Sequence, residues 1–85
     1  MKTLEELKQT PEYWLCTIQN EIFRQVKFYM DKEKLDKTQF ANKFDFSKRY
    51  VSSILNGNFN GSLEKLIELS LKINVYPIIE YKQIK

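Results

Sequence analysis

Five polar side chains within residues 47–53 form the part of the sequence best suited to contact another molecule. They are Ser47, Lys48, Arg49, Ser52 and Ser53. On a short helix they share the outer side, and such a helix has the width to enter the major groove of B-form DNA. An arginine there can donate two parallel hydrogen bonds to guanine, and a lysine can reach guanine or a phosphate. The serines are short enough to let the helix approach closely.

Positive charge gathers in the same part of the chain. The net charge is +3, and residues 24–61 hold eight Lys or Arg against four acids, whereas residues 1–23 hold two lysines against four glutamates. A polyanion could be met at this basic middle segment. A lysine-rich solvated face would have the same composition, so charge alone does not distinguish these two interpretations.

Catalytic and metal chemistry have little support in the residues. The sequence has no His and a single cysteine, so neither an internal disulfide nor a zinc site is expected. The N-terminal glutamates have no His or second nucleophile to complete a catalytic site, and there is no glycine-rich phosphate loop. We therefore expect no enzymatic activity, no cofactor and no metal, and we interpret Cys16 as a small core residue.

A long helix is expected in the N-terminal third. Thr3 can cap a short turn over residues 4–9, and Thr10 followed by Pro11 is a stronger helix start. This second helix should reach about Lys32. Its apolar residues recur about every 3.6 residues and form one stripe. The stripe consists of Leu15, Ile18, Ile22, Val26 and Tyr29, with Phe23 and Met30 beside it.

Three further helices are expected after it. Asp36 and Gln39 form a capping box, and Ser47 and Ser62 are N-cap residues. The turn-forming segment 56–61 separates the last two helices. The residues expected to face the core are Phe40, Ala41 and Phe44 in the first helix, Val51, Ile54 and Leu55 in the second, and Leu63, Leu66, Ile67, Leu69, Leu71 and Ile73 in the third.

The spacing of three core residues sharpens this prediction. Ala41 is small at the point where the two short helices would cross closely. Val51 and Ile54 follow ten and thirteen residues later and are placed to pack beneath it. Asp45 and Phe46 break the first of these helices, so the turn is expected there. The pattern predicts a helix-turn-helix at roughly residues 36–56.

This segment resembles the lambda-repressor-like (Cro/C1, or Xre) helix-turn-helix family of small bacterial regulators. The matching stretches are residues 38–44, 47–57 and 63–69, which read TQFANKF, SKRYVSSILNG and LEKLIEL. The family usually has glycine where this chain has Asp45, so the resemblance implies a left-handed residue there. Asp tolerates that conformation better than most residues other than glycine. The resemblance implies an all-α fold of four to five helices, here with a long N-terminal helix and a short C-terminal extended segment. It also implies sequence-specific binding of double-stranded DNA and, in the family's commoner mode, transcriptional repression.

The resemblance further implies roles for individual residues. Ser47, Lys48, Arg49, Ser52 and Ser53 fall at base-contacting positions. The positions near the DNA phosphates are occupied by Lys37, Thr38, Lys43 and Asn56. The amides and the positive dipole end of the first short helix would suit a phosphate at its start. Phosphate contacts would set affinity and register, and base contacts would set sequence preference. Tyr50 could pack on the preceding helix or touch a sugar.

The two ends of the chain are candidates for contact with another protein. Pro77 prevents the last helix from continuing, and the β-branched and aromatic residues around it favour an extended strand. Such a strand would pair with its copy in a homodimer or pack on the long helix. Trp14 and Phe28 fall outside the apolar stripe. They belong either to a second layer of the same core or to a surface that contacts a partner. The candidate interface residues are Trp14, Phe28, Tyr76, Ile78, Ile79 and Tyr81.

One domain is expected over residues 1–85, with a core at about 34–74, an N-terminal helical extension at 1–33 and an extended tail at 75–85. No apolar run approaches the roughly 20 residues of a membrane helix. The first residues are too acidic for a signal peptide. We therefore expect a cytoplasmic repressor that acts as a dimer. The alternative function is an antitoxin or another module whose flanks hold a toxin or a different protein partner.

Overall fold

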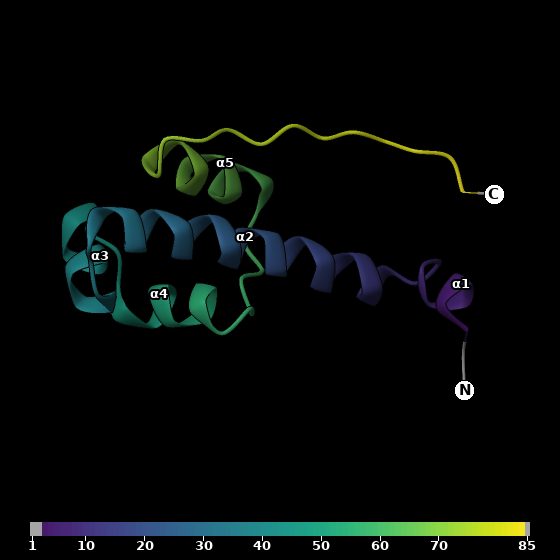
Figure 1. Ribbon diagram of the computed structural model, residues 1–85, viewed down its shortest axis with the longest axis horizontal. Helices are drawn as coiled ribbons and strands as arrows, with labels where there is room; N and C mark the ends of the chain where they lie inside the picture. The colour runs from purple at the N-terminus through teal and green to yellow at the C-terminus, as the bar shows by residue number, and fades with distance from the viewer. Residues whose placement is uncertain (1–2, 85) are drawn as a thin grey trace.

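The computed structural model describes residues 3–84, whose regular structure is entirely helical (Figure 1). The elements are α1 (Leu4–Leu7), α2 (Pro11–Glu33), α3 (Lys37–Phe44), α4 (Lys48–Leu55) and α5 (Leu63–Lys72). No strand occurs within residues 3–84, and the segment after α5 is extended (Figure 1). The predicted all-α fold is confirmed.

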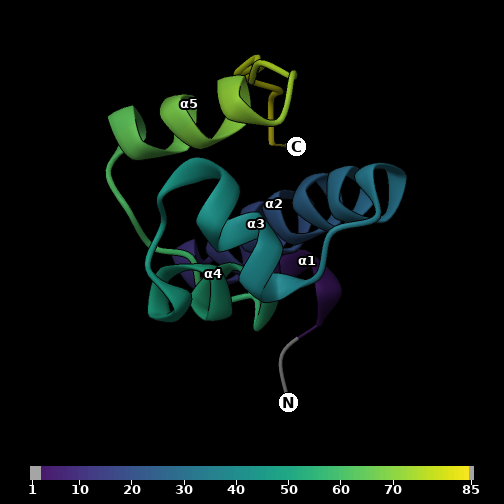
Figure 2. The same ribbon diagram turned by 90° about the vertical axis from the view of Figure 1, so that its left-hand side faces the viewer.

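Helix α2 runs along the length of the molecule, and α3, α4 and α5 gather around its C-terminal half (Figure 1). In this view α5 lies on one side of α2, with α3 and α4 on the other. The end view in Figure 2 shows α3 between α4 and α5. All four helices contribute to one core, whose most deeply buried large side chains are Val26, Phe40, Val51, Ile54 and Leu69.

Each helix begins at its predicted cap. In all five cases the cap side chain accepts a hydrogen bond from the backbone N–H three residues further on, and the caps are Thr3, Thr10, Asp36, Ser47 and Ser62. The capping box of Asp36 and Gln39 is complete, because the Gln39 side chain also accepts from the Asp36 N–H at 2.8 Å. Caps satisfy local backbone donors, and for that reason they could be read from short stretches of sequence.

Four helices also end in one common way. A left-handed residue follows the helix, and the next N–H donates to the carbonyl five residues back, as in a Schellman motif. The left-handed residues are Lys34, Asp45, Gly57 and Asn74. Three of them are not glycine, and each non-glycine residue in this conformation costs up to about 1–2 kcal/mol, less for Asn and Asp. The predicted left-handed turn at Asp45 is confirmed.

The apolar stripe of α2 is buried over only part of its length. Ile22, Val26 and Tyr29 are buried as predicted, but Leu15 is 43% exposed and Ile18 is 51% exposed. The prediction that these last two residues enter the core is wrong. The N-terminal half of α2 projects beyond α3, α4 and α5, so these helices do not cover its stripe (Figure 1).

Three smaller expectations are also corrected. Cys16 is exposed instead of buried, because it lies on the same projecting half of α2. α1 ends at Leu7 instead of reaching residue 9, since the Thr10 N–H and hydroxyl both turn back to the Leu7 carbonyl. In α5 only one side is covered by the core. The predicted core residues that remain exposed there are Leu63, Ile67 and Leu71, whereas Leu69 and Ile73 are buried.

Candidate nucleic-acid interface

Helices α3 and α4 form the predicted helix-turn-helix. Ala41 is 2% exposed, and Val51 and Ile54 on α4 are equally inaccessible. These three residues belong to a single cluster of core side chains. A methyl group at position 41 leaves room for the α4 backbone to come close, because a larger side chain would displace packed neighbours. The spacing predicted from the sequence is therefore confirmed as a packing feature.

The turn between α3 and α4 fixes the direction of α4. Asp45 adopts φ 57° and ψ 40°, and the Phe46 N–H donates to the Ala41 carbonyl at 2.8 Å. The Phe46 ring then lies 5.9 Å from the Phe40 ring and 4.9 Å from the Tyr50 ring, measured between centroids. These aromatic contacts join the turn to both helices, so α4 is held in one orientation.

Tyr50 contributes to the core and not to the outer face of α4. Its ring packs against Phe46 and lies 6.1 Å from that of Phe59, in the loop after α4. The sequence left open packing on the preceding helix, whereas these ring contacts are with the turn before α4 and the loop after it. Burial raises the pKa of the Tyr50 hydroxyl above its usual value of 10, and the negative charge of Glu68 acts in the same direction.

The outer face of α4 presents most of the predicted DNA-contacting residues together. Spacings of four residues place Lys48, Ser52 and Asn56 in one row, with Arg49 beside it. Lys48, Arg49 and Asn56 are exposed and Ser52 is half-buried. Ser53 lies at the edge of this face. The long side chains of Lys48 and Arg49 and the short side chain of Ser52 thus share one solvent-accessible face.

Two of the predicted serines are engaged in the helix itself. The Ser47 hydroxyl oxygen accepts from the Tyr50 N–H at 3.0 Å as the N-cap of α4. The Ser53 hydroxyl donates to the Tyr50 carbonyl at 2.7 Å. Ser47 keeps its hydroxyl proton for another acceptor, and Ser53 keeps its lone pairs for another donor. Both hydroxyls can therefore still form a hydrogen bond with a ligand.

The charges at the start of α4 are unusual for a helix. The N-terminal end of a helix dipole is positive and favours acids. The first turn of α4 has no acid, its cap Ser47 is neutral, and Lys48 and Arg49 stand there instead. Neither cation forms an ion pair with any acid in residues 3–84. This end of α4 thus has a concentration of positive charge that an external anion would relieve.

The start of α3 is less suited to an anion than the sequence suggested. Lys37 and Thr38 are exposed there, as expected. The Asp36 carboxylate, however, accepts the Gln39 N–H at 2.8 Å and places a negative charge at the same helix end. Any phosphate contact here would depend on the side chains of Lys37 and Thr38 more than on the helix dipole. Asn42 lies one turn after Thr38 on the same exposed face, a candidate that the spacing of four residues could have indicated.

Lys43 is not brought together with the other predicted phosphate contacts. Its Nζ donates to the Tyr29 hydroxyl at 2.9 Å and lies 4.0 Å from a Glu33 carboxylate oxygen, both on α2. The hydrogen bond with Tyr29 raises the pKa of Lys43, and the negative charge of Glu33 adds to the effect. Lys43 therefore links α3 to α2 in this structure. Sequence reasoning could not find this contact, because the partners are far apart along the chain.

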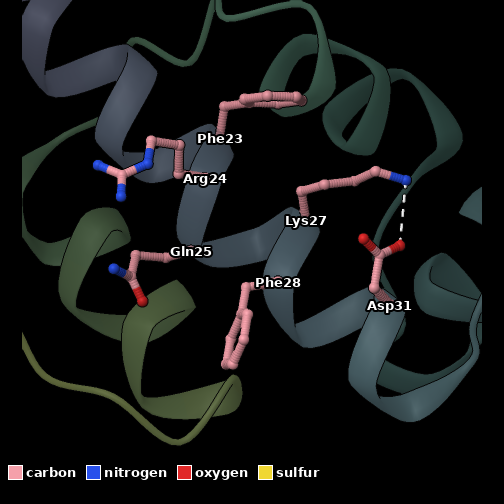
Figure 3. Close-up of a pocket in the computed structure, with 6 residues that line it drawn as sticks. All are labelled: Phe23, Arg24, Gln25, Lys27, Phe28 and Asp31. Carbon is pink, nitrogen blue, oxygen red and sulfur yellow. Dashed lines mark ion pairs between the residues drawn. The ribbon is translucent and has the colours of Figure 1, made fainter.

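A shallow depression lies on the surface of α2 (Figure 3). All the residues that line it belong to α2, and Phe23 and Phe28 point to different sides of the helix (Figure 3). Lys27 and Asp31 form an ion pair at 3.1 Å along the same helix. Side chains from one helix that diverge in this way do not enclose a ligand. Within residues 3–84, no three His, Cys, Asp or Glu side chains are grouped so that they could share a metal ion.

Comparisons with known proteins found no similar family, curated protein or solved structure: no family model matches the sequence, and neither of the other two searches gave a match. In the part of the chain that the structure describes, no helix is both long enough and apolar enough to cross a membrane. The helix-turn-helix and the surface charge of α4 are thus the observations from which a function can be argued.

Proposed function

We propose that this protein binds double-stranded DNA in a sequence-specific manner by placing α4 in the major groove. The observation that favours this function is the pair of unpaired cations, Lys48 and Arg49, at the positive end of a helix with a neutral cap. Such an arrangement is unfavourable in the isolated protein and becomes favourable next to phosphates and guanine edges. The resemblance to lambda-repressor-like regulators supports the same function.

The exposed faces of α3 and α4 suggest a division of roles. Arg49 and Lys48 read guanine in the groove, and Ser52 permits close approach. Lys37 and Thr38 contact the backbone phosphates and set the register of the protein on the duplex. By the same resemblance, the protein is a cytoplasmic transcriptional repressor.

The experiment begins with selection from a pool of random DNA duplexes by the full chain. Binding of the enriched duplex is then measured by fluorescence anisotropy at two salt concentrations. The Lys48→Ala/Arg49→Ala variant should bind at least about 100-fold more weakly, because loss of a bidentate base contact alone costs about 1–3 kcal/mol. The slope of its affinity against salt concentration should change less than the affinity itself, because the phosphate contacts assigned to Lys37 and Thr38 remain.

The matched control is Arg24→Ala/Lys27→Ala, which removes the same two charges from exposed positions on α2. This variant should bind the selected duplex within about threefold of the unmodified protein. It loses only part of the nonspecific attraction, which depends on total charge, and keeps the proposed contacts of α4. The proposal fails if selection enriches no common sequence, or if the α4 variant and the α2 variant lose affinity equally.

A further inference from the structure

The C-terminal tail, residues 76–84, is apolar but covered by nothing in the structure. Its large apolar side chains are between 63% and 92% exposed, and they are Tyr76, Ile78, Ile79, Tyr81 and Ile84. The last backbone hydrogen bond toward this end of the chain is that from the Val75 N–H to the Ser70 carbonyl. Within the described residues, the tail therefore presents both apolar side chains and a row of unpaired peptide groups.

These two features together favour strand pairing. Successive side chains of an extended segment point to opposite sides, and in the tail both sides have large apolar residues, one of them together with Glu80 and Lys82. Peptide groups that stay unpaired beside apolar surface are a template for another strand. The tail does not pack on its own α2, as the high exposure of its side chains shows. Within the described residues no segment pairs with the tail, so a strand that pairs with it would have to come from another chain.

A second uncovered apolar surface lies on the projecting half of α2. It is formed by Trp14, Leu15 and Ile18, which are 43–51% exposed. Figures 1 and 2 both show the tail running back along α2 on the side where α5 lies, toward α1 (Figure 1, Figure 2). A two-stranded ribbon is marginal alone and needs an apolar face to pack on. The projecting half of α2 offers such a face at the same end of the molecule.

The exposed apolar area matches the needs of a stable dimer. At roughly 200 Å² for a large side chain, the tail and the projecting half of α2 together expose about 1,000 Å² per chain. A typical specific interface buries about 800 Å² per partner. One copy of this chain thus supplies enough surface for a two-fold symmetric interface, in which each subunit uses the same residues.

We propose that a second copy of this chain covers both surfaces, with the two tails paired as an antiparallel ribbon about a two-fold axis at Tyr81. Charge selects this register. It places Glu80 opposite Lys82 of the partner subunit, twice in the dimer. A register centred on Glu80 would set two like charges opposite each other, which is destabilising. The strand side with Ile79 and Tyr81 has no charge, so it is the side that packs on α2. On the other side the same register places Ile78 opposite Ile84 of the partner subunit, so these two side chains cover each other across the strands.

The first test is the state of association by sedimentation, without DNA, so that its result is independent of DNA binding. The unmodified chain should be dimeric at micromolar concentration. Glu80→Lys should weaken the dimer roughly 10-fold or more, because it replaces two attractive cross-strand pairs by two repulsive ones. The exchange variant Glu80→Lys/Lys82→Glu should restore the dimer. These side chains are exposed, and circular dichroism verifies that the helices remain folded in each variant.

Disulfide formation tests the register. In a Cys16→Ser background, Tyr81→Cys should form an interchain disulfide on mild oxidation, because the two copies of residue 81 would face each other within about 5.5 Å between Cα atoms. Ile79→Cys is the matched control. Its two copies would be separated by four residues along the strand, about 13 Å, and should remain reduced.

Several results would overturn the proposal. If the chain is still monomeric at 100 times the micromolar concentration of the first test, the proposed dimer is rejected. A different protein would then be the partner that covers this surface. A dimer that survives deletion of residues 76–85 would place the interface elsewhere. Efficient cross-linking through residue 79 with none through residue 81 would reject the proposed pairing.

Discussion

The two halves of α2 have the same amphipathic pattern but different surroundings. Around Ile22 and Val26 the helix is enclosed by α3, α4 and α5, and these side chains are buried. One to two turns earlier, around Leu15 and Ile18, the same stripe continues beyond these three helices, and its side chains are about half exposed (Figure 1). The enclosed half holds the helix-turn-helix in place, and the projecting half presents apolar surface. Periodicity therefore reports which residues share a face, and the number of neighbouring elements decides whether that face is buried.

The largest expected effect is on the free energy of unfolding, and it appears when alanine substitutions at two isoleucines one turn apart are compared. Ile22→Ala should lower the free energy of unfolding by about 2–3 kcal/mol, since it removes buried methyl groups and leaves a cavity. Ile18→Ala should change it by less than about 1 kcal/mol, because half of that side chain already contacts solvent. Urea unfolding of dilute monomer measures both values. Equal losses would mean that the two halves of α2 are equally enclosed.

A smaller effect is expected at the turn of the helix-turn-helix. Asp45→Gly should raise the free energy of unfolding by about 0.5 kcal/mol, because relief of the left-handed conformation outweighs the extra flexibility of glycine. Asp45→Ala should lower it, since alanine tolerates this conformation less well. Thermal unfolding of both variants gives the comparison. A stabilising alanine would show that the backbone at residue 45 is not constrained by the turn.

The smallest effect concerns pH and the aromatic contacts of α4. Tyr50 has a raised pKa in the folded protein, so the protonated hydroxyl is favoured by folding. Its contribution to stability is complete below pH 10 and is lost as the pH rises through the folded-state pKa. Tyr50→Phe should therefore reduce the loss of stability between pH 9 and pH 11.5, measured by urea unfolding. An identical loss in the variant would show that Tyr50 does not contribute to it.

Within the candidate interface, the sequence predicted interactions along one helix better than interactions between two helices. Lys48, Arg49 and Asn56 share the outer face of α4 because helical spacing alone places them there. Lys43 was expected near the DNA phosphates but bonds to Tyr29, a residue fourteen positions earlier on another helix. Its position depends on how α2 and α3 pack, which spacing along α3 does not specify.

The sequence by itself determined where the helices begin and where α3 ends. Asp36, Ser47 and Ser62 cap helices through bonds to residues three positions away, and Asp45 ends α3 through equally local geometry. The tertiary structure alone decided which apolar residues found partners. On α2, Leu15 and Cys16 are exposed because the three helices that pack on it cover only its C-terminal half. The tail is exposed because no described element packs on it. Burial is a property of all the elements that meet at a place, and no window of neighbouring residues contains that information.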